Sequence, residues 1–184
     1  MSVLGAVSVK LHATPKAVNI ARLLVKSALE SWGLDELRDD ALLIVSELVT
    51  NAVMVGPGPV RDPDGLTLVA VQVRVQDSTL VIEVWDRHRK LPMPRTAGDD
   101  AESGRGLLLV EAFSSRWGVW EPESGGKVVY ADLNIDKPPV VSLEGELVKL
   151  PDEVLAAHVA GDSEPHVMAD TALMLRCMNG FALL

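Results

Sequence analysis

Four segments of β-type sequence fall into two pairs, and each pair is joined by residues typical of a tight turn. The segments are residues 66–75, 80–85, 116–121 and 127–133. In the first segment valines alternate with Gln72 and Arg74, which predicts a strand with one polar face. Gln76-Asp77-Ser78-Thr79 joins the first pair, and Pro122-Glu123-Ser124-Gly125-Gly126 joins the second. Two antiparallel hairpins are the simplest connection, so the chain is restricted to a mainly antiparallel sheet.

Two segments with helical spacing precede the first hairpin. Thr14-Pro15, a capping residue followed by proline, predicts the start of a helix that ends near Gly33. Asp35 predicts the N-cap of a second helix, which ends near Val55 because a Gly-Pro-Gly-Pro segment follows. Each segment has apolar residues at three- and four-residue spacing. Each helix is therefore expected to bury one face.

The order of these elements indicates the fold class. A short apolar helix is expected at 107–113, between the hairpins, and residues 3–12 are expected to add an edge strand. Two helices, a hairpin, a helix and a hairpin predict an α+β, two-layer sandwich with helices on one face of the sheet. Pro138-Pro139 indicates a boundary between a domain at 1–135 and a C-terminal extension at 136–184. The two helices of the extension are expected at 151–159 and 165–178.

Charge and hydropathy exclude several classes of protein. Seventeen basic residues against 26 acidic ones give a net charge of −9, and the basic residues are scattered, so no nucleic-acid partner is expected. No apolar run approaches the ~20 residues that span a bilayer, so no membrane association is expected. The N-terminal residues lack a secretory signal, and Cys177 is the lone cysteine. A cytoplasmic location is expected.

Glu47 and Asn51 form the first candidate site. At 3.6 residues per turn they lie about 40° apart in projection, so a carboxylate and an amide face the same way. A solvated helix face would explain the pair equally well if it stood alone. The surrounding run, residues 41–55, is predominantly apolar. That setting favours a functional pair.

Two further candidates come from loops that follow a strand or precede a helix. Asp86 directly follows an apolar strand and opens a long loop, a place where sites are commonly assembled. Gly104-Arg105-Gly106 precedes the apolar helix, where backbone N–H groups and the helix dipole favour phosphate oxygens. Each feature alone is also compatible with an ordinary turn. Their order along the chain makes them informative together.

This order of motifs resembles the GHKL ATPase superfamily. Ser46-Glu47-Leu48-Val49-Thr50-Asn51-Ala52-Val53 is similar to its N box, and Trp85-Asp86 with Pro92 is similar to its G1 region. Gly104-Arg105-Gly106-Leu107 is similar to its G2 box. The likeness covers roughly residues 8–135 and is closest to stand-alone anti-sigma-factor-type serine/threonine kinases. It implies a Bergerat-type ATP-binding fold.

The resemblance also implies ATP and Mg²⁺ as cofactors and gives each motif a role. Asp86 would accept a hydrogen bond from the adenine amino group, and Asn51 would hold Mg²⁺. Glu47 would be the general base. In Gly104-Arg105-Gly106-Leu107, the glycines would carry the lid over the phosphates and the arginine would add a charge contact. The expected reaction transfers the γ-phosphoryl group to a serine or threonine of a small regulatory partner, either a sigma factor or an anti-anti-sigma-type antagonist.

The chain also departs from the family pattern. His88 and Lys90 stand where the family has glycines after the aspartate, and we expect His88 to be a surface loop residue. The threonine that supports the adenine-binding aspartate is replaced within Lys127-Val128-Val129. These changes favour an alternative function, a non-catalytic partner-binding module that retains the ATPase fold. The intact Glu47 and Asn51 favour the kinase.

The methionine-rich helical stripe at 165–178 leaves two alternatives open. It packs on its own domain, or it covers a partner protein or a second subunit, so a homodimer is possible. The catalytic half of a sensor histidine kinase is disfavoured, because no helical hairpin with a phospho-acceptor histidine precedes the first helix.

Overall fold

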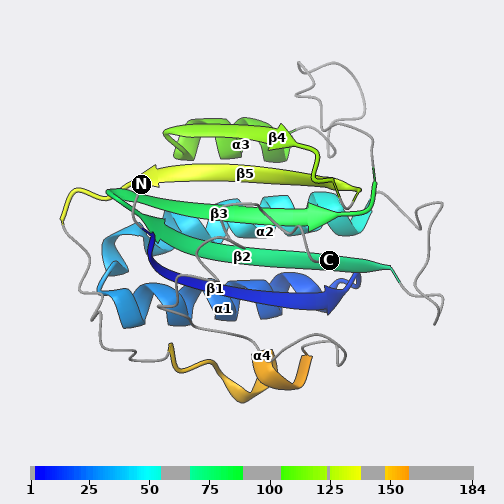
Figure 1. Cartoon of the computed structure of the whole chain (residues 1–184), viewed down its shortest axis with the longest axis horizontal. Coiled ribbons are helices and arrows are strands. Elements are labelled where there is room, and N and C mark those ends of the chain that lie inside the picture. Colours follow the sequence, from blue (N-terminus) through cyan, green and yellow to red (C-terminus); the bar gives the residue numbers. More distant parts are fainter. Residues whose placement is uncertain (1–2, 55–66, 89–104, 124, 138–147, 158–184) are drawn as a thin grey trace.

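The described part of the chain forms a five-stranded sheet with helices on one face (Figure 1). In this computed structural model the described residues are 3–54, 67–88, 105–123, 125–137 and 148–157. The elements are β1 (Val3–His12), α1 (Lys16–Trp32), the 3-10 turn η1 (Asp35–Leu37), α2 (Arg38–Met54), β2 (Leu68–Gln76), β3 (Thr79–Asp86), α3 (Arg105–Phe113), β4 (Arg116–Trp120), β5 (Lys127–Asn134) and α4 (Asp152–Ala157). The predicted two-layer α+β class is confirmed.

The sheet has the strand order β1-β2-β3-β5-β4, and all neighbouring strands are antiparallel. Both predicted hairpins are present, as β2–β3 and β4–β5, and the predicted edge strand is β1. In the register Val73 lies opposite Ile82, and Val84 lies opposite Val129. Because successive side chains of a strand point to opposite faces, these residues all lie on the face that the helices cover.

The core lies between this face of the sheet and the helices α1 and α2, which pack against each other. Helix α1 buries a stripe at the predicted spacing: Ala17, Ala21, Leu24, Val25, Ala28, Leu29 and Trp32. Helix α2 buries Ala41, Ile44, Val45, Leu48, Val49 and Ala52. Both helices have 17 residues. Across the described ranges, none of the helices combines the length and the hydropathy that crossing a bilayer requires.

The predicted C-terminal ends of α1 near Gly33 and of α2 near Val55 are correct, and the two predicted N-caps are wrong. Gly33 caps α1 with a φ of 65°, in the left-handed region that glycine adopts without strain. The N-cap of α1 is Pro15 without a side-chain hydrogen bond, so the capping role predicted for Thr14 is wrong. Asp35 begins η1, and α2 starts only at Arg38. The Asp35 carboxylate accepts a hydrogen bond from the Arg38 guanidinium, which is one reason it does not cap the helix.

Helix α4 packs against α1 and β1, at the edge of the sheet (Figure 1). Val148, Leu150 and Val154 join the main core, with Val154 fully buried. The first predicted helix of the C-terminal extension is therefore present over Asp152–Ala157, and the rest of its predicted range, 158–159, lies outside the described residues. The boundary at Pro138-Pro139 and the helix at 165–178 lie outside the described residues, so the division of the chain at 135 stays a prediction.

Candidate nucleotide site

Helices α2 and α3 bring Glu47, Asn51 and Gly106 together. Gly106 is the second residue of α3, and its Cα faces the side chains of α2. A Cβ atom at Gly106 would overlap Glu47 Oε2 and would lie 3.7 Å from Asn51 Nδ2. Only glycine permits this approach of backbone to carboxylate. Three of the residues predicted from separate motifs therefore share one location.

The side of α2 that carries Glu47 and Asn51 is not a fully solvated face. Both side chains are half-buried, because α3 packs on this side of the helix. Asn51 Nδ2 is buried and has no hydrogen-bond partner in the described part of the chain. A buried amide nitrogen without a hydrogen-bond partner destabilises the folded state unless a ligand accepts a hydrogen bond from it. It fits the phosphate and Mg²⁺ end of a nucleotide, since the amide group offers both a donor and an acceptor.

Asp86, the last residue of β3, lies on the helix-covered side of the sheet, because it alternates with the core residues Ile82 and Val84. Its side chain is 2% exposed. Oδ1 accepts two hydrogen bonds of 2.8 Å, one from the backbone N–H of His88 and one from Lys127 Nζ. Burial raises the pKa of the Asp86 carboxyl above its ordinary value, although both hydrogen bonds act in the opposite direction. This carboxylate is already paired.

Lys127, the first residue of β5, lies directly opposite Asp86 in the β3–β5 register. Its side chain is 4% exposed, and Nζ also donates to the carbonyl oxygen of His88 at 2.8 Å. From the sequence, the residue that replaces the family's threonine could be placed only within Lys127-Val128-Val129. The sequence did not single out the lysine among the three, because its pairing with the last residue of β3 depends on the strand register.

His88 is buried at 7% exposure, so the prediction of a surface loop residue is wrong. Its backbone N–H donates to Asp86, and its carbonyl oxygen accepts from Lys127. These two hydrogen bonds hold His88 against the end of the sheet. Its ring atom Nε2 is buried without a hydrogen-bond partner in the described part of the chain. The end of β3 thus holds a carboxylate, an ammonium group and an unpaired imidazole nitrogen.

The remaining predicted residues are the other members of the Gly104-Arg105-Gly106-Leu107 motif. Gly104 lies outside the described residues. Arg105 begins α3 and is exposed, whereas Leu107 is 6% exposed and packs inward. Leu107 therefore anchors the helix that carries Gly106. Within the described ranges no group of three or more His, Cys, Asp and Glu side chains is placed to hold a metal ion.

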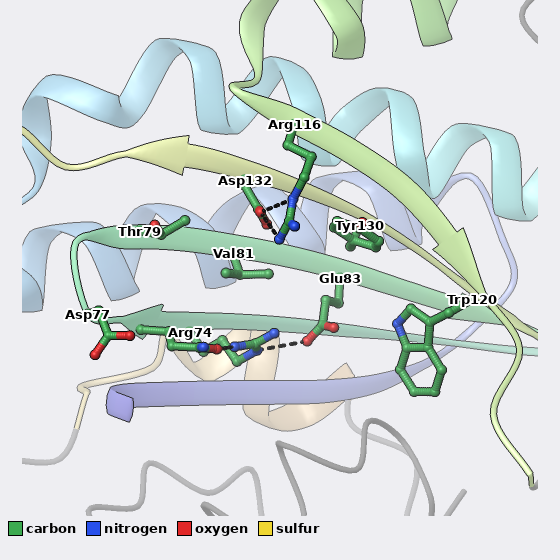
Figure 2. A pocket seen from close by; sticks show the side chains of 10 residues that line it. Arg74, Asp77, Thr79, Val81, Glu83, Arg116, Trp120, Tyr130 and Asp132 are labelled. Atoms are coloured by element: carbon green, nitrogen blue, oxygen red, sulfur yellow. Dashed lines mark hydrogen bonds and ion pairs between the residues drawn. The ribbon is translucent and has the colours of Figure 1, made fainter. Parts of the chain in front are cut away.

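A depression that sequence reasoning did not identify lies on the face of the sheet opposite the helices (Figure 2). It has a volume of about 370 Å³. Arg74 pairs with Glu83 at 3.0 Å, and Arg116 pairs with Asp132 at 2.6 Å. The predicted polar face of the 66–75 strand was the signal for it. Because its residues point away from α2 and α3, this pocket is separate from the predicted nucleotide site.

The fold and the site define the class of protein. An antiparallel sheet covered on one face by helices, with a glutamate and an asparagine of α2 against a glycine at the start of α3, is the arrangement that the GHKL motifs predict. The chain belongs to the family described as Histidine kinase-like ATPase domain, whose profile matches residues 11–132. The family match covers well over half of the chain, and it implies an ATP site. The GHKL resemblance is thereby confirmed.

Two other comparisons add little. A search of curated proteins finds no match. A solved structure, the crystal structure of the RsbU and RsbW domains of Rv1364c from Mycobacterium tuberculosis, is similar at 21% identity with a TM-score of 0.49. The match covers 72% of this chain and 33% of that chain, so this chain spans about a third of the length of the solved chain. A likeness this distant does not carry the function of that protein to this chain.

Proposed function

We propose that this chain is an ATP-binding regulatory protein, a serine/threonine kinase of the anti-sigma-factor type that binds and phosphorylates a small partner protein. Membership of the ATPase family supports the nucleotide part of this proposal. The kinase part is supported by the motif likeness to stand-alone anti-sigma-factor-type kinases.

One observation carries the proposal: Gly106 packs directly against Glu47, beside Asn51. A general base and a metal ligand are useful only if the phosphate-binding segment lies next to them. A domain that served as a scaffold alone would have no need to keep a carboxylate and an unpaired amide against a glycine. The half-buried position of Glu47 also suits a base that must reach a substrate hydroxyl.

The roles of the residues follow from their chemistry. Bound ATP with Mg²⁺ would supply the phosphoryl group and its charge neutralisation. Asn51 would hold the metal through its amide oxygen. Glu47 would orient the partner's hydroxyl and accept its proton, while the N-terminal turn of α3 offers backbone N–H groups to phosphate oxygens. Since phosphoryl transfer depends mainly on positioning and charge, only a modest base is required.

An exposed apolar surface on α3 supports a protein partner. Leu108, Leu109 and Phe113 are 44%, 36% and 43% exposed. Large apolar side chains gathered on one short helix are typical of an interaction surface. The surface lies on the helix that carries Gly106, so a partner bound there would be near the site.

The Asp86–Lys127 pair favours a second candidate function, a non-catalytic module that binds its partner without using the nucleotide. In this candidate the ATPase fold is retained for partner binding, and the paired Asp86 stabilises the end of the sheet. The two functions differ in what the partner complex requires. The kinase needs Glu47, and the module does not.

The test is incubation of the full chain with γ-labelled ATP, Mg²⁺ and proteins that co-purify with it. The kinase predicts label on a partner serine or threonine, lost in Glu47→Ala and kept in the exposed-site control Glu36→Ala. The module predicts no label and partner binding unchanged by Asn51→Ala. Label that persists in Glu47→Ala would remove the role given to that residue.

A further inference from the structure

The corner formed by Asp86, His88 and Lys127 contains one more charged group than a site for reading adenine requires. A carboxylate selects adenine by accepting a hydrogen bond from its exocyclic amino group. In this chain Lys127 Nζ already donates to Asp86 Oδ1 at 2.8 Å. The His88 N–H donates to the same oxygen, so both donors lie on Oδ1 and Lys127 compensates the charge of the carboxylate from within the protein.

The internal donor is held firmly. Lys127 and Asp86 lie opposite each other in adjacent strands, so the backbone of the sheet fixes their separation. Lys127 Nζ donates a second hydrogen bond to the His88 carbonyl oxygen, also at 2.8 Å. The side chains are 4% and 2% exposed, and a buried charge that loses its partner is strongly penalised. The ammonium group therefore stays on the carboxylate.

An adenine amino group would meet a carboxylate whose charge Lys127 already compensates. It is a neutral donor, whereas the Lys127 bond is charge-assisted, and hydrogen bonds with an ionised donor and acceptor are roughly twice as strong. The lysine is also tethered, while a nucleotide must give up translational freedom to bind. The carboxylate consequently gains little from an adenine amino group.

We infer that Lys127 is a specificity-determining residue, which compensates the charge of the base-reading carboxylate of Asp86 from within the chain and leaves a site that binds triphosphates with little selection for adenine. The inference rests on the proposed nucleotide function. The phosphate end, with Glu47, Asn51 and Gly106, is unaffected by the pair. The nucleobase would contribute little to affinity, and ATP, GTP and a triphosphate without a base would bind alike.

The buried ring nitrogen of His88 is consistent with a base site in this corner. Nε2 is without a partner in the described part of the chain. A ring nitrogen can act as donor or acceptor according to its tautomer. A contact from this nitrogen would therefore not distinguish adenine from guanine.

The test is calorimetric titration of the full chain with Mg²⁺ and each of three probes: ATP, GTP and inorganic tripolyphosphate. The variant is Lys127→Thr, which removes the internal ammonium and leaves a hydroxyl. Lys127→Met, which preserves more of the buried volume, guards against a folding defect in the first variant. Lys137→Thr, at an exposed lysine just beyond β5, is the matched control. Far-UV circular dichroism establishes that each variant is folded.

We expect the wild type and Lys137→Thr to bind the three probes with dissociation constants within about threefold of one another. In Lys127→Thr, ATP should bind at least tenfold more tightly, a change of about 1.4 kcal/mol, and GTP should change by less than threefold. A tenfold preference of the wild type for ATP over GTP would overturn the inference and leave the proposed function intact. The inference would also be overturned if Lys127→Thr and Lys127→Met both fold and neither binds ATP more tightly than the wild type does, while the wild type binds tripolyphosphate. Failure of every protein to bind every probe would instead remove the nucleotide function itself, and the inference with it.

Discussion

Gly106 at the start of α3 faces the carboxylate of Glu47 on α2 so closely that a Cβ atom would overlap Oε2. The two residues are 59 positions apart in the sequence (106 minus 47). The contact joins the predicted base to the predicted phosphate-binding segment. It exists because α3 packs against α2 instead of standing free at the end of the sheet.

Gly106→Ala should separate the effect on the site from the effect on stability. The overlapping atom is the end of a flexible side chain, so Glu47 can rotate away. Alanine is also about 1 kcal/mol more favourable than glycine in a helix. We expect the free energy of unfolding in urea to change by less than about 1 kcal/mol. Phosphoryl transfer to the partner should fall about tenfold or more, because the base is displaced.

The control for Gly106→Ala is its combination with Glu47→Ala, which leaves room for the new methyl group. Adding Gly106→Ala to Glu47→Ala should change neither Mg²⁺–ATP affinity nor transfer further. If Gly106→Ala transfers phosphoryl groups as fast as the wild type, while Glu47→Ala does not, the contact between Gly106 and Glu47 does not position the base.

Gly126→Ala should destabilise the protein more than Gly125→Ala. Both glycines have positive φ, 78° and 91°, so both substitutions strain the backbone by about 1–2 kcal/mol. A Cβ at Gly126 would also overlap the carbonyl oxygen of Asp86 and lie 2.8 Å from Trp85 Nε1, whereas a Cβ at Gly125 meets nothing within 4 Å. We expect an additional loss of about 1–3 kcal/mol for Gly126→Ala in urea unfolding. Equal losses for the two variants would show that the hairpin shifts to relieve the overlap.

Arg74→Met should remove the partner of a buried carboxylate on the outer face of the sheet. Glu83 is 5% exposed and pairs with Arg74 Nε at 3.0 Å. We expect a loss of about 2–3 kcal/mol in the free energy of unfolding, because the carboxylate keeps its desolvation cost without its partner. Lys26→Met, in the exposed pair with Glu30, should cost less than about 0.5 kcal/mol.

The double variant Arg74→Met/Glu83→Leu completes this cycle. It should regain most of the stability lost in Arg74→Met, since neither charge then remains buried. A double variant no more stable than Arg74→Met would indicate that the arginine stem, and not the ion pair, supplies the stabilisation.

The Asp86–Lys127 pair should give stability a defined dependence on pH. Burial raises the pKa of Asp86 in the folded protein above its ordinary value of 3.8. Between these two pKa values the folded state binds more protons than the unfolded state, so the free energy of unfolding falls as pH rises. The contribution of Asp86 is therefore fully present below pH 3.8 and is lost as pH rises through the folded pKa.

This pH dependence is measured as the difference in urea-unfolding free energy between the wild type and Asp86→Asn/Lys127→Met. The difference isolates the pair from the other carboxylates, which both proteins share. Relative to the double variant, the wild type should lose stability from pH 3.8 upwards and then reach a plateau. A relative gain over the same range would mean that the ion pair outweighs the burial of the carboxylate.

Much of the fold was predictable from local patterns. Alternation around Gln72 and Arg74, together with two turn segments, predicted the hairpins, and the position of Gly33 predicted the end of α1. These signals are carried by residues close together in sequence. The start of α2 was placed too early, because the carboxylate of Asp35 pairs with Arg38 instead of capping the helix.

The candidate site was predictable only in part. Glu47, Asn51 and Gly106 were named from their motifs, and the structure brings these three together, although their roles stay predictions. The burial of His88 and the identity of the residue on Asp86 were not predictable. Both depend on which residue of β5 lies opposite the end of β3, and register is a property of the assembled sheet.

The sequence by itself determined the class of fold, the family and the residues that could form a nucleotide site, because periodicity, turns and motifs are local. Only the tertiary structure decided which of those residues are free to act. It placed Gly106 on Glu47 through helix packing, and it placed Lys127 on Asp86 through strand register. A buried carboxylate and a lysine 41 positions later become partners only when the two strands pair, because burial makes leaving either charge alone too costly.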